Sequence, residues 1–218
     1  MNKSQQIVTH TCPLCYSHSL SSYYQNKYAE YLQCSQCDLV SVPVQFHLSA
    51  VDEKLRYDTH ENNPENAGYR AFLSQVFEPV IAQIGKGDKG LDFGCGPGPT
   101  LSLMFEEVGY SVDLFDKFYA NNLEVFERQY DFITATEVVE HLREPRVEMD
   151  RLLGMLKQGG VLAVMTQMIS EKVDFASWYY KNDPTHICFF SKKTMYYLAK
   201  QWGIKVTFFG DNVALFMA

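Results

Sequence analysis

Four of the six cysteines in this sequence form two C-x-x-C pairs, Cys12 with Cys15 and Cys34 with Cys37. The 18 residues between the pairs are enough for a short hairpin that brings the two turns together. Four thiolates held about 2.3 Å from one ion complete the tetrahedral coordination of Zn²⁺ and leave no position open for chemistry. The spacing therefore predicts a structural zinc site.

Two disulfides and a redox-active C-x-x-C motif are the alternative interpretations of these pairs. Residues 1–6 lead into no apolar signal core, which predicts a cytoplasmic protein and disfavours disulfides. A redox motif would need only one of the pairs. His10 and His18 could substitute as ligands, although the four cysteines complete the set without them. Cys95 and Cys188 stand alone, and Cys188 is expected in the core or in a pocket.

A second group of residues surrounds a glycine-rich stretch, in which Gly94, Gly96 and Gly98 alternate directly after a short apolar strand. Glycines at such a turn let the backbone approach a ligand closely beside a helix N-terminus. Their G-x-G-x-G spacing differs from the G-x-G-x-x-G of dinucleotide-binding proteins. Asp92 precedes the first glycine by two residues. Asp116 ends the following strand, where a carboxylate can accept two hydrogen bonds from a ribose diol.

Two histidines, His141 and His186, are candidate general bases because imidazole titrates near the working pH. His141 follows a strand in a helical stretch, and a hydrogen-bonded structural role is its alternative. His186 lies between a turn and the aromatic pair Phe189 and Phe190. The three aromatic residues 178–180 precede it and either pack together or wall an acceptor pocket.

Strands and helices alternate along the rest of the chain, which predicts a mostly parallel sheet with helices on both faces and a closing antiparallel hairpin. The expected helices cover residues 69–84, 101–108, 145–156 and 191–202, and the expected strands cover 91–93, 111–116, 132–136, 161–166, 204–209 and 213–217. We expect three parts: a zinc-binding module of residues 1–43, a connector of 44–67 and an α/β domain of 68–218.

The chain has 218 residues, 46% of them hydrophobic and 21% charged, which excludes disordered and collagen-like classes. No apolar run reaches the length of a membrane span. The formal net charge of -7 argues against a nucleic-acid partner, although a local basic patch around Lys3, Lys27 and Lys54 stays open. The oligomeric state does not follow from the sequence.

The stretch Asp92-Phe93-Gly94-Cys95-Gly96-Pro97-Gly98 resembles the first motif of class I S-adenosylmethionine-dependent methyltransferases. Residues 137–142 resemble the family's segment after strand four, and residues 156–160 its turn before strand five. Residues 183–191 are similar to the segment before the last helix in the branch that includes ubiquinone-biosynthesis methyltransferases. The resemblance covers about residues 69–218 and implies a Rossmann-like methyltransferase sheet.

The resemblance also implies a binding site for S-adenosylmethionine. Asp92 would lie near the ammonium group of the cofactor, Asp116 would hold the ribose hydroxyls, and Glu137 would line the sulfonium side with Val138. A loop-ordering acid is the alternative for Asp92, and a solvated acid at the strand end is the alternative for Asp116. The full implied set is Asp92, Gly94, Cys95, Gly96, Gly98, Asp116, Lys117, Phe118, Glu137 and Val138.

One departure concerns the stretch between Asp116 and Asp131, which is too short for the helix and outer strand that the family places there. That strand helps to build the adenine pocket in the family, so Phe118 and Tyr119 are the candidates here. The implied activity is methyl transfer to a small-molecule acceptor by in-line displacement, with His186 and His141 as catalytic candidates. The alternatives are an rRNA or tRNA methyltransferase, a non-catalytic binding module with the same fold, and a nicotinamide-dependent dehydrogenase.

Overall fold

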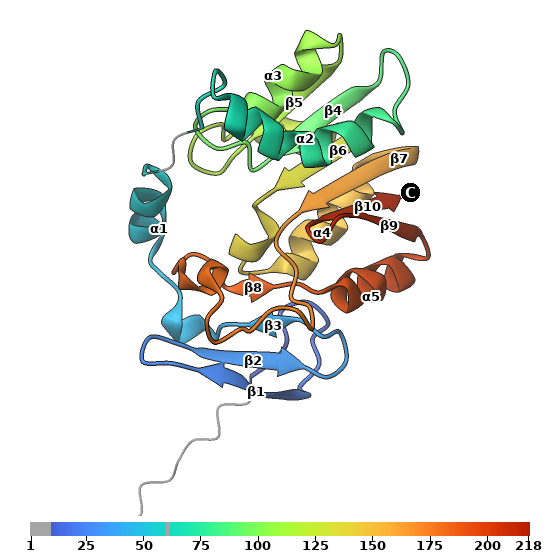
Figure 1. Ribbon diagram of the computed structural model, residues 1–218. Helices are drawn as coiled ribbons and strands as arrows, with labels where there is room; N and C mark the ends of the chain where they lie inside the picture. The colour runs from blue at the N-terminus through green and yellow to red at the C-terminus, as the bar shows by residue number, and fades with distance from the viewer. Residues whose placement is uncertain (1–9, 60–61) are drawn as a thin grey trace, which may run out of the picture.

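The computed structural model describes residues 10–59 and 62–218, so that Lys3 lies outside the described residues. The larger of its two sheets has the strand order β5-β4-β6-β7-β10-β9 (Figure 1). Its strands are β4 (Lys89–Phe93), β5 (Ser111–Phe115), β6 (Tyr130–Thr136), β7 (Leu156–Met165), β9 (Lys205–Phe209) and β10 (Val213–Met217). The first four strands in this order run parallel, and β10 is antiparallel to both of its neighbours. The predicted mostly parallel sheet with a C-terminal hairpin is confirmed.

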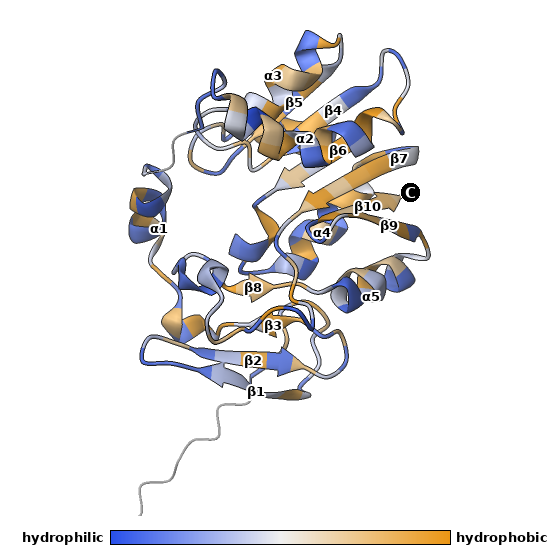
Figure 2. Cartoon of the chain, in the orientation of Figure 1, coloured by the Kyte–Doolittle hydropathy of each residue, from blue (hydrophilic) through white to orange (hydrophobic). Residues whose placement is uncertain are grey.

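Two pairs of helices cover the sheet, and β7 shows how its side chains are divided between them. Val161, Ala163 and Met165 pack with α2 and α3, whereas Leu162 and Val164 belong to the core on the face of α4 and α5. The helices are α2 (Ala67–Ile81), α3 (Thr100–Glu107), α4 (Pro145–Gly154) and α5 (Lys192–Trp202). Figure 2 shows the apolar strands between these helices.

The helix boundaries follow local signals in the sequence. Ser191 caps α5 and forms a capping box with Thr194, and Gly203 ends the helix in the left-handed conformation at φ 70°. Pro79 lies in the last turn of α2 and does not split that helix. The sequence predicts that Leu156 ends the helix over residues 145–156, but in the structure α4 ends at Gly154 and Leu156 begins β7.

The smaller sheet joins the N-terminal module to the C-terminal half of the chain. It has the order β1-β2-β3-β8, and its strands are β1 (Leu20–Gln25), β2 (Glu30–Cys34), β3 (Val40–Ser41) and β8 (Cys188–Phe189). Val40 pairs with Phe189, and the amide of Val42 donates to the Ile187 carbonyl over 2.9 Å. β8 was not expected. Because of it, the cysteine-bearing residues share one hydrophobic core with the α4 and α5 face of the large sheet.

The stretch expected as a connector contains a helix, α1 (Ala50–Tyr57), which lies between the small sheet and α2 (Figure 1). The short stretch after β5 folds back on itself through a bridge between Asp116 and Ala120. A 3-10 helix at Leu123–Glu127 follows, and Phe126 packs on Phe115 with ring centroids 4.6 Å apart. β5 is therefore an edge strand covered by its own continuation.

None of the helices in the described part of the chain is long and apolar enough to cross a membrane.

Candidate functional site

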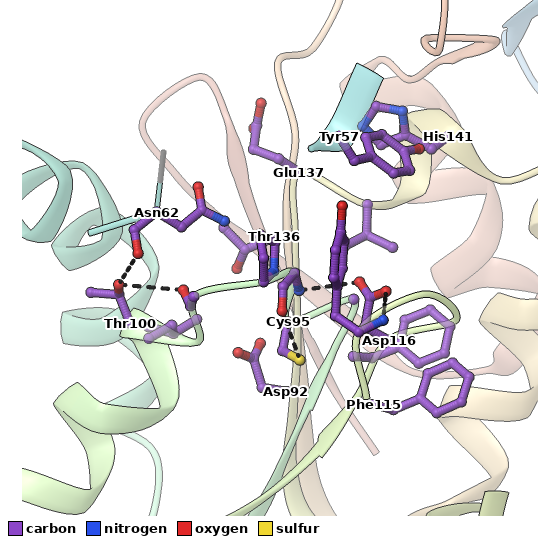
Figure 3. Close-up of a pocket in the computed structure, with 18 of the residues that line it drawn as sticks. Tyr57, Asn62, Asp92, Cys95, Thr100, Phe115, Asp116, Thr136, Glu137 and His141 are labelled. Carbon is purple, nitrogen blue, oxygen red and sulfur yellow. Dashed lines mark hydrogen bonds between the residues drawn. The ribbon is translucent and has the colours of Figure 1, made fainter. Parts of the chain in front are cut away.

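A cavity of about 420 Å³ lies at the carboxyl ends of β4, β5 and β6. This is where the strand order of the sheet reverses, the usual ligand position in such folds. The cavity is lined by both candidate bases and by all of the implied cofactor residues except Phe118. These lining residues are Asp92, Gly94, Cys95, Gly96, Gly98, Asp116, Lys117, Glu137, Val138, His141 and His186. Residues from four separate regions of the sequence therefore meet in one cavity (Figure 3).

The glycine loop is built so that side chains could not replace its glycines. Gly94 has φ +77°, and a Cβ there would come within 2.3 Å of the Val138 side chain. A Cβ on Gly98 would come within 2.2 Å of the Asn62 carbonyl oxygen. These contacts leave room only for bare backbone beside the cavity, as close approach to a ligand requires.

Asp116 ties the glycine loop to the end of β5. One of its carboxylate oxygens accepts from the Gly96 amide at 3.1 Å, and the other accepts from the amides of Phe118 and Tyr119 at 2.8 and 3.1 Å (Figure 3). This is not a solvated acid at a strand end. A carboxylate offers about four acceptor positions, two on each oxygen, so the oxygen that accepts from Gly96 keeps one position for a further donor, whereas both positions of the other oxygen are used.

Asp92 is buried in β4 at 4% exposure, and its only described hydrogen bond comes from the Thr134 hydroxyl at 2.8 Å. Burial and, to a smaller extent, the Asp116 charge raise the pKa of this carboxyl to about 6, although the hydrogen bond from Thr134 lowers it. Asp92 is therefore a desolvated acid facing the cavity, and a cationic group there would stabilise its ionised form.

Glu137 follows β6 with φ 52°, a strained conformation for a residue with a side chain. Burial and the neighbouring Glu140 charge raise the pKa of Glu137 to about 9. Its Oε1 atom and the Thr136 hydroxyl are buried, and no hydrogen-bond partner is described for either. Two unpaired buried oxygens on the cavity wall indicate a missing donor.

The two histidines lie together at the other end of the cavity, with ring centroids 4.7 Å apart. The Nδ1 atom of His141 lies 3.0 Å from the Thr185 carbonyl oxygen, and that of His186 lies 2.7 Å from the Tyr180 carbonyl oxygen. A carbonyl oxygen can only accept, so Nδ1 carries a proton in each ring, and in the neutral form of the ring the lone pair is on Nε2. Burial lowers the pKa of His141, which favours its neutral form.

Glu140 lies behind the histidines with no solvent exposure. One carboxylate oxygen accepts from the Tyr180 hydroxyl, and the other has no partner among the described residues. The potential ligand atoms of Glu140, His141 and His186 all lie within 4.8 Å of one another, so these residues could also hold a divalent cation.

The cysteines form a second cluster, outside the cavity and inside the N-terminal module. The Sγ atoms of Cys12 and Cys37 are 3.5 Å apart, those of Cys15 and Cys34 are 3.4 Å apart, and all four lie within 4.8 Å. A disulfide needs about 2.05 Å, and the four cysteines are free. Tetrahedral coordination at about 2.3 Å places sulfur atoms about 3.8 Å apart. The donor set therefore fits Zn²⁺.

Some residues that the sequence predicts in or near the site do not lie where they are expected. Phe118 does not line the cavity but packs on Tyr57, and Tyr119 lines the cavity in its place. The aromatic residues 178–180 do not line it either: Trp178 and Tyr180 pack with the buried rings beneath the module. Arg70 pairs with Glu107.

Tyr57, Asn62, Thr136 and Asp183 are among the lining residues that were not predicted from the sequence. Asp183 lies within the family-like segment 183–191, and Thr136 directly precedes the family-like segment 137–142, so both could have been found by extending those motifs. Tyr57 and Asn62 belong to residues 44–67, the stretch expected as a connector. The hydrophobic periodicity of that stretch gives no signal for a helix or for a site.

A family model described as a methyltransferase domain matches residues 61–207. A ubiquinone biosynthesis O-methyltransferase from Erwinia tasmaniensis is 30% identical over 85 residues, which are 39% of this chain and 35% of that protein. The match thus spans about a third of the length of that curated relative.

Two solved structures from Burkholderia thailandensis share the fold. A 1,6-didemethyltoxoflavin-N1-methyltransferase, solved with 1,6-didemethyltoxoflavin and S-adenosylhomocysteine, is 12% identical with a TM-score of 0.55, covering 91% of this chain and 98% of its own. An O-methyltransferase family protein is 14% identical with a TM-score of 0.52, covering 76% of this chain and 62% of its own. At this identity the likeness concerns the fold alone.

Replacing Cys34 with serine should remove one thiolate and reduce the zinc content well below one ion per chain. Amide exchange should then accelerate in residues 10–43 and also in 187–191, because β8 belongs to the same sheet. Elemental analysis and hydrogen-exchange mass spectrometry measure both effects. Cys95→Ser is the matched control and should keep its metal. Full zinc content in Cys34→Ser would remove Cys34 from the site.

Replacing Asp92 with asparagine should stabilise the ligand-free protein. The pKa of Asp92 is raised from 3.8 to about 6, so folding binds an extra proton between these values and the wild-type stability falls as pH rises through them. Above about pH 6 the variant should be more stable by about 1–3 kcal/mol, with no difference below about pH 4. Urea unfolding at several pH values tests this. A variant that is less stable at neutral pH would contradict the raised pKa.

Proposed function

The chain belongs to the methyltransferase domain family, and on that premise we propose that it transfers a methyl group from S-adenosylmethionine to a small-molecule acceptor. The observation that carries the proposal is one cavity with two chemically different ends. Buried acids and a bare glycine loop form one end, and two imidazoles with free Nε2 atoms form the other. A volume of about 420 Å³ suits a nucleoside cofactor with a small partner.

At the first end, the chain's acids fit a cationic cofactor. S-adenosylmethionine supplies an activated methyl group on a sulfonium and also carries an ammonium. Asp92 would balance the ammonium, and Glu137 with the Thr136 hydroxyl would offer their unpaired oxygens on the sulfonium side. The remaining acceptor position of Asp116 would take a hydrogen bond from a ribose hydroxyl, and Tyr119 would flank the adenine. A dinucleotide carries two phosphate charges, which these acids would repel.

At the second end, His141 and His186 would receive the proton of the acceptor. In-line displacement needs an electron-rich acceptor atom held against the methyl group with water excluded. The Nε2 atom of a neutral imidazole can accept that proton as the new bond forms. The hydrogen bonds from both Nδ1 atoms to backbone carbonyls fix the rings in the required tautomer. His186 and His141 are therefore the proposed bases.

The charges of the chain favour a small molecule over RNA as the methyl acceptor. The net charge is -7, and Lys54, one of the lysines of the predicted basic patch, pairs with Asp58. Lys27 stacks over Tyr28. An RNA backbone requires several unpaired cations on one face. In the same proposal, the four cysteines hold a structural zinc ion in the module of residues 1–43.

Replacing Asp116 with alanine should weaken the binding of S-adenosylhomocysteine by about 1–3 kcal/mol, the scale of lost hydrogen bonds to a charged group. Calorimetric titration measures the change. Asp113→Asn is the matched control, because this acid lies in β5, three residues before Asp116, but pairs with Arg128 outside the cavity. Unchanged affinity in Asp116→Ala would remove Asp116 from the site.

Replacing His186 with glutamine should lower kcat by about 10²–10⁴-fold and leave the affinity for S-adenosylhomocysteine within a factor of about three, because only proton transfer is lost. The assay follows S-adenosylhomocysteine release with a panel of phenols, hydroxy acids and sugars, and with total tRNA and rRNA in parallel. His47→Gln is the control outside the cavity. Turnover with RNA alone would contradict the small-molecule acceptor, and activity that needs an added divalent cation would assign the histidines as ligands.

A further inference from the structure

The helix α1 docks on the rest of the protein through a carboxylate. Glu53 is its one buried side chain, at 5% exposure, whereas Val51 and Leu55 are 71% and 60% exposed. A surface helix usually buries an apolar stripe. Without such a stripe, the position of α1 depends on polar contacts.

The partners of Glu53 come from three parts of the chain. The Lys117 ammonium lies 2.5 Å from its Oε1 atom, and the Tyr57 hydroxyl donates to the same atom over 3.0 Å. The Arg143 guanidinium lies 3.7 Å from Oε2. A buried carboxylate is tolerated only when it is paired and hydrogen-bonded, and these contacts supply both.

Other contacts of the same segment reach both ends of the cavity. The Tyr119 hydroxyl donates to Asp58 over 2.6 Å, beside the ribose-binding acid. Arg56 donates two hydrogen bonds to Asp183, at 3.0 and 2.7 Å, near the histidines. The Tyr57 ring stands against His141 with centroids 5.2 Å apart, as Figure 3 shows. α1 thus spans the cavity from its cofactor end to its acceptor end.

We propose that Glu53 is a positioning residue that couples the two ends of the cavity. It holds Lys117, which directly follows Asp116, and it seats Tyr57 against His141. A cofactor that orders the loop 116–119 therefore fixes α1 as well, and α1 then completes the wall beside the acceptor. This coupling rests on the proposed function for the identity of the ligand, whereas the seating of α1 by Glu53 does not.

Hydrogen-exchange mass spectrometry on the full chain tests the proposal, with Glu53→Gln as the variant and S-adenosylhomocysteine as the probe. Lys117 is half exposed, so its charge stays solvated in the variant and the fold is retained. Exchange of residues 50–57 should accelerate about tenfold in Glu53→Gln while that of α2 is unchanged. In the wild type, the probe should slow exchange in α1 several-fold; in the variant it should bind and leave α1 unaffected.

Two further variants separate the explanations. Leu55→Gln changes a side chain on the exposed face of the same helix, 60% exposed, and should match the wild type. Lys117→Met removes the partner and should also accelerate exchange in α1. Wild-type exchange in Glu53→Gln would overturn the proposal, and so would a bound probe that leaves α1 unchanged in the wild type. If the probe does not bind, the proposed function and the coupling fail, and the ligand-free comparison decides whether Glu53 seats the helix.

Discussion

Buried acidic side chains around one cavity are the constraint on which the rest of the structure depends. No ion pair among the described residues involves Asp92, Glu137 or Glu140, and their hydrogen bonds come from the neutral hydroxyls of Thr134 and Tyr180. Desolvation without a cation raises the pKa of Asp92 to about 6 and that of Glu137 to about 9. Glu53 differs, since Lys117 balances it. The unbalanced acids line or lie behind the cavity, which is the expected arrangement when a cationic ligand completes the site.

Hydrogen bonds connect the acceptor end of the cavity to the cysteine-containing N-terminal module. The backbone of Ile187 donates its amide to the Glu140 carbonyl and accepts from the Val42 amide, so that it lies between the large sheet and the module. His186 directly precedes this residue. The Asp38 carboxylate, near the second cysteine pair, accepts from the Ser191 hydroxyl over 2.6 Å. The N-terminal module therefore fixes the segment that carries a candidate base, whereas the glycine loop is fixed separately through Asp116.

The parts that could be predicted from the sequence depend on short-range geometry. The glycine loop and Asp116 each follow a strand, and the carboxyl ends of parallel strands meet at the same edge of a sheet. The spacing of the four cysteines by itself predicts that they form one cluster. β8 has only two residues, and its partner β3 lies in the N-terminal module, so no local pattern indicates it. In α1 the hydrophobic periodicity gives no signal, because the buried residue is an acid. Phe118 and Tyr119 are both candidates for the adenine pocket in the sequence, and of the two only Tyr119 lines the cavity, because the chain turns back at the bridge between Asp116 and Ala120.

Calorimetric titration of the full chain with S-adenosylhomocysteine, with NAD as the control and the metal content read on the same sample, tests the central claim most directly. The account predicts one micromolar site for S-adenosylhomocysteine and none for NAD. Absence of S-adenosylhomocysteine binding, or binding of NAD in its place, would contradict the account of the buried acids as the seat of a cationic cofactor.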